Sequence, residues 1–313
     1  MRWTRDPKSS KRGDAVLNWS RWVLNAQSRS ALPFIAPALA LVAATIVLPA
    51  FYVLYLSFNA SSFGQAPTFV GLANYERILG DPYFWRSMGN TVAVVLGVVH
   101  VELLLGMAIA MLLANGVPFK RIVLACVIAP YAVSEVGAVV MWRYAFDPEI
   151  GIATDVLRFF GLGPLEWSVH PWQGLLMVAL LSIWLHLPFT VIIIYAARLG
   201  IPKDLYEAAR IDGATPWQSF RRVTLPLLMP ALLVAMLFRY IFAFRLFSEV
   251  WLLTQGGPAR TTEVVAVYLY LEAFRYSNFG AAAATGWIMV LACMVLASFY
   301  LRRLYKDMFS HAA

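Results

Sequence analysis

The sequence lacks the motifs that most often build catalytic and nucleotide-binding sites. It contains no G-x-x-x-x-G-K-[ST] stretch and no G-x-G-x-x-G stretch, so neither of the common glycine-rich cradles for nucleotide phosphates is present. Its four histidines, His100, His170, His186 and His311, are scattered without the spacing of a zinc site. A Ser/His/Asp triad is recognised by geometry, and the order of residues alone supports none. We therefore expect no cofactor in this chain.

Cysteine is scarce as well. The only two, Cys126 and Cys293, both lie in apolar runs, where a free cysteine behaves as a small buried hydrophobic residue. This excludes a disulfide framework of the kind that holds small secreted domains together.

Charged residues make up only 13% of the 313 residues, whereas 61% are hydrophobic and the mean hydropathy is +0.68. Soluble domains are about 45–50% apolar, so the composition predicts a polytopic membrane protein. A membrane helix needs about 20 apolar residues, and six stretches are long enough. They lie near residues 32–57, 89–114, 121–144, 172–198, 228–254 and 280–302.

The Lys and Arg residues that produce the net charge of +8 are unevenly distributed. They crowd the N-terminal segment, the region around residue 120, residues 198–222 and the C-terminal end. The segments between these hold Arg77, Arg86, Arg143, Arg158, Arg260 and Arg275. Cytoplasmic segments are the richer in Lys and Arg. We therefore predict an all-α membrane protein of six transmembrane helices, with both termini and the central loop cytoplasmic and with no nucleic-acid partner.

The predicted organisation has three parts. Residues 1–30 form a basic cytoplasmic tail, in which Trp19 and Trp22 indicate an interfacial amphipathic helix. A signal peptide is the competing interpretation, but the apolar run that follows is longer than the roughly 7–15 residues of a signal h-region. Residues 31–303 form the transmembrane domain, with residues 201–228 as its central loop, and residues 304–313 form a cytoplasmic tail.

The central loop predicts two short helices joined by a tight turn. Pro202 can open the first, and Gly213 can end it in the left-handed conformation that glycine tolerates. The second begins with an N-cap threonine, Thr215, then Pro216, and has Gln218 as the third helical residue.

Small residues form one face of the first of these helices, with Glu207 beside it. They follow the i, i+3, i+4, i+7 spacing of a helix face, as Leu205, Ala208, Ala209 and Asp212. A face of small side chains permits close approach of another surface, which indicates a docking site. The alternative is a plain helical hairpin in which Glu207 pairs with Arg210.

This loop resembles the EAA loop of ATP-binding-cassette (ABC) importer permeases, most closely those of the carbohydrate, maltose-type branch. The resemblance is carried by Glu207-Ala208-Ala209, Asp212-Gly213-Ala214, Phe220, Leu225-Pro226 and Pro230. It implies a coupling helix that enters a cleft of a separate ATPase subunit, formed by Glu207, Ala208, Ala209, Asp212, Gly213 and Ala214.

Two outer segments, Gly71–Tyr75 and Thr254–Pro258, also resemble this family, the second one specifically the larger of its two paired permeases. The resemblance covers most of the chain from about residue 30 onward. Aromatic residues follow the second segment, as Tyr268, Tyr270, Phe274 and Phe279. They are typical both of a belt at the lipid headgroups and of a protein interface, and the sequence leaves both interpretations open.

Ionisable residues within the hydrocarbon layer cost about 2.5–3.5 kcal/mol each on insertion scales and usually face a cavity or a partner. In the fifth predicted span, a continuous helix would hold four candidates within an arc of about 120°, namely Arg239, Phe242, Arg245 and Glu249. Arg245 and Glu249 are also spaced to neutralise each other, which leaves Arg239 without a local partner. We predict that this face lines a substrate path.

The fourth predicted span carries Ser182, His186 and Phe189 on one face, a combination that suits hydrogen bonding and stacking with a sugar. The alternative is structural, because Pro188 frees a backbone carbonyl that a nearby polar side chain can satisfy. Glu135 in the third span is a weaker path candidate. His100 and Glu102 in the second span are candidates for packing against a partner.

The resemblance implies a multi-pass permease in a bacterial or archaeal plasma (inner) membrane, which itself is not an enzyme. Its implied partners are a second permease subunit, two ATPase subunits that hold ATP and magnesium, an external substrate-binding protein and a sugar. A secondary carrier and a membrane-embedded enzyme remain alternatives. The sequence leaves open whether the sugar is neutral or anionic.

Overall fold

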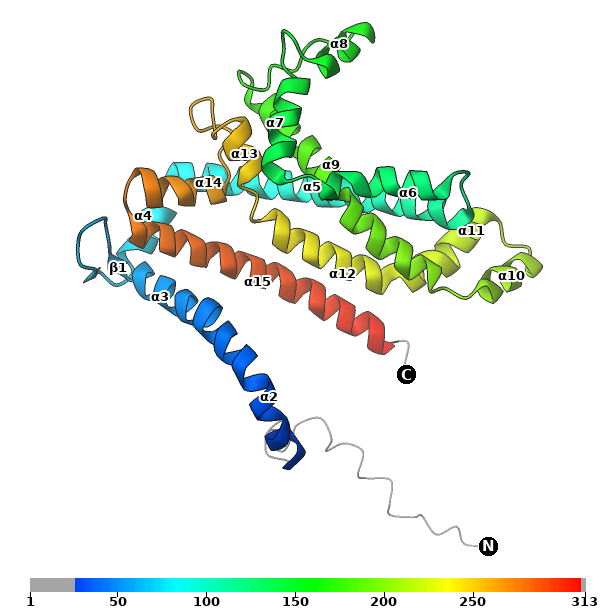
Figure 1. Cartoon of the computed structure of the whole chain (residues 1–313), viewed down its shortest axis with the longest axis horizontal. Helices are drawn as coiled ribbons and strands as arrows, with labels where there is room; N and C mark the ends of the chain where they lie inside the picture. The colour runs from blue at the N-terminus through cyan, green and yellow to red at the C-terminus, as the bar shows by residue number, and fades with distance from the viewer. Residues whose placement is uncertain (1–25, 311–313) are drawn as a thin grey trace, which may run out of the picture. The chain divides into compact units, whose positions relative to one another are not determined.

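The structure is a computed structural model that describes residues 26–310, and these residues are mostly α-helical (Figure 1). The chain divides into two compact units, residues 1–55 and 56–313, which are described separately. The predicted interfacial helix in the basic tail lies outside the described residues.

The first unit contains a helical run made of α2 (Ala26–Val42), a π-helical turn (Ala43–Val47) and most of α3 (Leu48–Ser57). From Pro33 to Ser57 this run is apolar enough to cross a membrane, as predicted for the first span. Large hydrophobic side chains such as Phe34 and Phe51 are exposed along it, as expected of a helix that meets lipid.

Long helices dominate the second unit: α5 (Pro82–Asn115), α9 (Pro171–Leu199), α12 (Leu225–Ala243) and α15 (Phe279–Ser310). Helix α11 (Pro216–Ser219) and a π-helical turn (Phe220–Thr224) run into α12. The second helix of the predicted central hairpin is therefore the start of the fifth span and no separate element. Among the described residues, five helices can cross a membrane by length and composition, or six if one bent pair counts as a span.

That bent pair replaces the third predicted span. Helix α6 (Lys120–Ile128) continues as a 3₁₀ turn (Ala129–Ala132), and α7 (Glu135–Ala145) then leaves at an angle of 103° (Figure 1). Pro130 lies in the turn and lacks the N–H that a continuing helix needs. The Ser134 hydroxyl accepts a bond from the Gly137 N–H at 3.1 Å and so starts α7 afresh. The membrane span predicted over residues 121–144 is therefore formed by a bent pair of helices.

The fifth predicted span, residues 228–254, was treated as one continuous helix, and this was wrong. Helix α12 ends at Ala243, and α13 (Ser248–Leu253) is a separate element. The Arg245 and Leu246 N–H groups bond to carbonyls three residues earlier, at 3.0 and 3.1 Å, which tightens and closes the last turn. Arg245 therefore lies in a link and Glu249 on another helix, so the arc predicted from a continuous helix does not exist.

Short elements complete the second unit. They are strands β1 (Asn59–Ala60) and β2 (Thr68–Phe69), which pair antiparallel, helices α4 (Ala73–Leu79), α8 (Ile152–Phe159), α10 (Lys203–Ile211) and α14 (Val265–Tyr270), and a π-helical turn (Leu271–Arg275).

Tyr268 in α14 serves neither of the roles left open for the outer aromatic residues. Its side chain is 2% exposed, its ring packs edge-on against Phe84, and its hydroxyl donates to Asp81 at 2.8 Å. Nearby, Arg260 forms two hydrogen bonds with Glu263 and lies 4.2 Å from the centre of the Tyr83 ring. These contacts tie the loop that follows α13 to the start of α5.

Helices α5 and α9 pack closely where Gly106 meets Thr190. A Cβ atom on Gly106 would lie 2.8 Å from the Thr190 Cγ2 atom, closer than two carbon atoms can approach. We expect Gly106→Val to lower the free energy of unfolding by about 1–3 kcal/mol, as overpacking typically does. Gly97→Val on the same helix is the control, because nothing lies within 4 Å of its Cβ position. Equal losses in the thermal unfolding of the two purified variants would contradict this packing.

The carboxyl group of Glu272, in the π-helical turn after α14, should make stability depend on pH. Burial raises the pKa of this group above its ordinary value of 4.5, and Arg77, at 3.4 Å, lowers the pKa only in part. The folded protein therefore keeps this proton at pH values where the unfolded chain has lost it, so stability falls as pH rises above the unfolded pKa. Glu272→Gln should flatten the fall in unfolding temperature above about pH 4.5. Glu76→Gln, at an exposed site on α4, should leave that fall unchanged. Parallel profiles for all three proteins would refute this.

Candidate functional site

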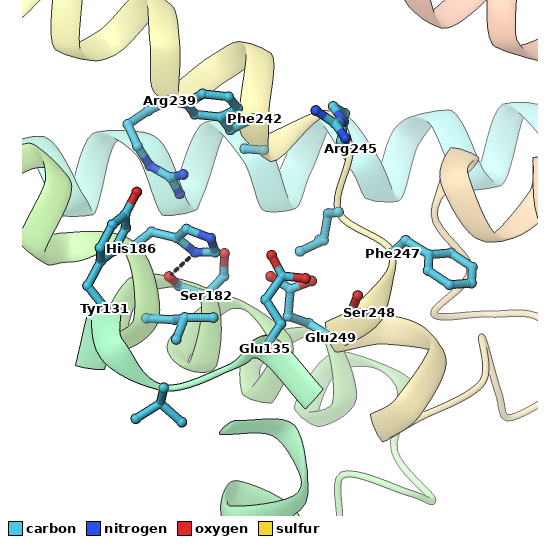
Figure 2. A pocket seen from close by; sticks show the side chains of 14 residues that line it. Tyr131, Glu135, Ser182, His186, Arg239, Phe242, Arg245, Phe247, Ser248 and Glu249 are labelled. Carbon is cyan, nitrogen blue, oxygen red and sulfur yellow. Dashed lines mark hydrogen bonds between the residues drawn. The ribbon is translucent and has the colours of Figure 1, made fainter. Parts of the chain in front are cut away.

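A cavity of about 530 Å³ opens where both interrupted spans meet α9 and α12 (Figure 2). Its volume falls in the range of about 300–1,000 Å³ typical of small-molecule sites. It is lined by Tyr131, Val133, Glu135, Ser182, Leu185, His186, Arg239, Phe242, Ala243, Arg245, Leu246, Phe247, Ser248 and Glu249.

The two helix breaks and the cavity belong together. The break between α6 and α7 supplies residues 131–135, and the break between α12 and α13 supplies residues 245–249. Non-helical backbone at membrane depth is tolerated only where it is buried in protein or lines a water-filled space. The cavity provides such a space for both breaks.

Arg239 forms an ion pair with a residue that is distant in the sequence, Glu102. Its Nε donates to one carboxylate oxygen of Glu102 at 2.5 Å and its Nη2 to the other at 2.8 Å. Both side chains are almost completely buried, and the pair joins α5 to α12. Glu102 therefore acts within the chain, which corrects the prediction that it packs against a partner.

His186 and Ser182 lie one turn apart on α9, and the His186 Nδ1 atom is 3.0 Å from the Ser182 carbonyl oxygen (Figure 2). A carbonyl oxygen only accepts, so Nδ1 carries the proton of this bond and Nε2 remains as an acceptor in the neutral ring. Pro188 frees the carbonyl four residues before it, which belongs to Trp184. The structural alternative for His186 was a hydrogen bond to that freed carbonyl. His186 instead bonds to the Ser182 carbonyl.

Two carboxylates that line the cavity, Glu135 and Glu249, lie close together in Figure 2. Each belongs to the first turn of its helix, α7 or α13. Glu249 is only 3% exposed. Among the described residues, no ion pair involves either of them, so the predicted neutralisation of Arg245 by Glu249 is not formed.

Phe189 is the one predicted path residue that does not line the cavity. Its ring packs edge-on against Phe238 and Phe242, with centroids 6.3 and 6.1 Å apart. The other seven predicted residues do line it. Of the residues missed, Tyr131 had a signal in the neighbouring Pro130, whereas the link residues Phe247 and Ser248 had none, because neither proline nor glycine marks the end of α12.

The predicted hairpin lies at the far end of α9 and α12. Gly213 has a φ of +77°. The Ala214 N–H donates to the Ala209 carbonyl at 2.9 Å, and the Gly213 N–H donates to the Arg210 carbonyl at 3.1 Å. These two hydrogen bonds form a Schellman motif. Thr215 and Gln218 form the reciprocal capping box that the sequence predicts. The hairpin's local geometry was thus predicted correctly.

The residues of the predicted docking face are accessible. Glu207, Ala208, Asp212 and Gly213 are exposed, whereas Ala209 and Ala214 are half-buried. Ile211 beside them is 86% exposed. No hydrogen bond or ion pair between described residues joins the Glu207 and Arg210 side chains, so the intrahelical pairing offered as an alternative is not formed.

The side chain of Tyr206 ties the hairpin to both neighbouring helices. The guanidinium of Arg198, at the end of α9, lies 4.2 Å from the centre of its ring. Its hydroxyl is 3.0 Å from the Thr224 hydroxyl, at the start of the fifth span. Tyr206 of α10 therefore contacts both α9 and the helix that continues into α12.

Residues 102–310 match a family profile described as the binding-protein-dependent transport system inner membrane component. The match spans more than half of the chain. The chain belongs to this family. Its members are membrane components of transporters, so this permease is not an enzyme.

Relatives of the permease match it over nearly its whole length. The trehalose transport system permease protein SugA of Mycobacterium tuberculosis is 32% identical over 282 residues, which cover 90% of each chain. The sulfoquinovosyl glycerol transport system permease protein SmoG of Agrobacterium fabrum is 33% identical over 291 residues, covering 91% of this permease and 93% of the relative.

Solved structures share the fold. A chain of the bacterial alginate ABC transporter, in complex with alginate pentasaccharide-bound periplasmic protein, superposes with a TM-score of 0.77 at 21% identity. The match covers 88% of this permease and 93% of that chain. This likeness confirms the predicted helical fold, and the family match with the apolar helices confirms a multi-pass permease of the inner membrane.

The ion pair between Glu102 and Arg239 should be costly to break. Glu102→Gln leaves a buried guanidinium without its counter-charge, so we expect the permease to lose about 3–5 kcal/mol of stability. Replacing both residues by methionine should recover much of that loss, because no unpaired charge remains. Asp155→Asn breaks the exposed pair with Arg158 and should cost about 0–1 kcal/mol. Equal shifts in unfolding temperature for Glu102→Gln and Asp155→Asn would contradict the assignment.

Proposed function

We propose that this permease is one of two membrane subunits of a carbohydrate importer, powered by ATP hydrolysis in two separate ATPase subunits. Family membership supports this, as do the names of its relatives, which transport trehalose and sulfoquinovosyl glycerol. An external binding protein delivers the sugar to the outer segments. ATP and magnesium act in the ATPase subunits.

In this proposal the termini and the hairpin lie in the cytoplasm. The distribution of Lys and Arg supports that orientation. The hairpin surface formed by Glu207, Ala208, Ala209, Asp212, Gly213 and Ala214 docks in a cleft of an ATPase subunit. Its exposure and small side chains suit such an insertion.

One observation carries the mechanism: the helices that supply the cavity wall are the helices that hold the hairpin. Helix α9 carries both His186 and Arg198, and the continuous helix that includes α12 carries both Arg239 and Thr224. Tyr206 joins the two ends. Closure of the ATPase pair moves the hairpin, and the same helices then change which side of the membrane the cavity faces.

The cavity holds the sugar during this change. The polar side chains of Ser182 and His186 offer hydrogen bonds, and the rings of Phe242 and Phe247 offer flat apolar surface for the sugar ring. Glu135, Arg239, Arg245 and Glu249 complete the wall. For transport to cycle, the two facings must differ in free energy by no more than differential binding can supply.

Reversing the charge on the hairpin tests the coupling. We expect Glu207→Lys to insert normally, to lose ATPase co-purification and to abolish ATP-driven uptake into vesicles, because it places a cation on the docking surface. Glu149→Lys is the control, since it makes the same change at an exposed site of the loop after α7. Normal co-purification and uptake by Glu207→Lys would refute the docking role.

A further inference from the structure

We infer that the section of the path lined by this permease is built for an uncharged, hydroxyl-rich glycoside and disfavours one that carries a sulfonate or carboxylate. This inference rests on the proposed function and concerns which sugars pass. The relatives named for trehalose and for sulfoquinovosyl glycerol leave both classes open.

The charge of Arg239, one of the two arginines that line the cavity, is already neutralised. Glu102 lies behind Arg239, outside the cavity lining, and takes two of its hydrogen bonds. Arginine recognises a carboxylate or sulfonate best through two parallel N–H bonds. Two of the five N–H donors of Arg239 already bond to Glu102. The Glu102 carboxylate, which is 0% exposed, also balances the charge of the guanidinium.

The two cavity carboxylates, by contrast, have no cation in direct contact with them in the part of the chain that the structure describes. Glu135 and Glu249 lie near each other in Figure 2, and no ion pair between described residues involves either one. Glu249 is aimed into the cavity while its side chain is almost fully buried. A ligand anion placed here would meet the negative charge of this carboxylate pair at short range, which weakens its binding in a desolvated site.

Arg245 does not offset them. In Figure 2 its guanidinium lies apart from the two carboxylates and points away from them. It also borders a separate apolar hollow between α12 and α15, lined by residues such as Phe244 and Met289. The positive end of α7 is likewise unavailable to a ligand, because its own Glu135 occupies the first turn.

What remains suits hydroxyl groups. Carboxylates accept hydrogen bonds from sugar hydroxyls, and the His186 Nε2 atom remains available as a further acceptor. Tyr131, Ser182 and Ser248 carry hydroxyls that can donate or accept. The cavity is thus rich in acceptors for a polyol and poor in free cations for an anion.

Two glycosides that differ in a single group test this charge selectivity. Sulfoquinovosyl glycerol carries a sulfonate where glucosyl glycerol carries the hydroxyl on carbon 6. We propose equilibrium dialysis of each, radiolabelled, against the assembled membrane complex without its binding protein. The wild type should bind the neutral ligand at least about tenfold more tightly, since 1.4 kcal/mol corresponds to a factor of ten. Glu135→Gln with Glu249→Gln should narrow that ratio about tenfold, mainly by improving sulfonate binding.

The control variant is Glu149→Gln, which removes the same charge outside the cavity and should leave the ratio unchanged. If the paired variant fails to assemble, Glu249→Gln alone should still narrow the ratio. Equal or tighter sulfonate binding by the wild type, a ratio insensitive to these substitutions, or no binding of glucosyl glycerol at millimolar concentration would overturn the inference. If the wild-type complex showed no ATP-dependent uptake of any glycoside, the proposed function itself would be overturned.

Discussion

In the hydrocarbon layer every backbone N–H and C=O group must find its partner within the protein, and this constraint organises the whole permease. Four long helices of the second unit meet it along most of their length, with interruptions at internal prolines such as Pro188. The two interrupted spans meet it only because their breaks face a cavity beside α9 and α12. The two helix breaks are therefore where polar side chains can gather, and the candidate site follows from these breaks.

The ion pair between Glu102 and Arg239 gives this site its electrostatic character. Without Glu102, Arg239 would present an uncompensated cation to the cavity, and an anionic sugar would be a natural ligand. With it, the balance of the cavity shifts to the carboxylates of Glu135 and Glu249. A residue outside the cavity thus decides what the cavity attracts, because the pair satisfies its charge before any ligand arrives.

Local signals were sufficient to predict the hairpin. The left-handed glycine at 213 and the Thr215–Gln218 capping box depend only on residues within a few positions of each other, and both were predicted correctly. The path residues were harder. Most of the polar residues chosen from the spans do line one cavity, since polar groups in such segments need a common wet face. The reasoning for the fifth span was nevertheless wrong, because i, i+4 geometry requires a helix that does not continue past Ala243.

The sequence alone determined that this chain spans a membrane, which residues form the hairpin and to which family it is related, because hydrophobic runs, caps and motif spacing are local properties. Tertiary structure decided the partner of Arg239, 137 residues away in sequence, the isolation of Glu249 and the packing of Phe189 away from the cavity. These depend on which helix faces which, and no periodicity within a single span records that.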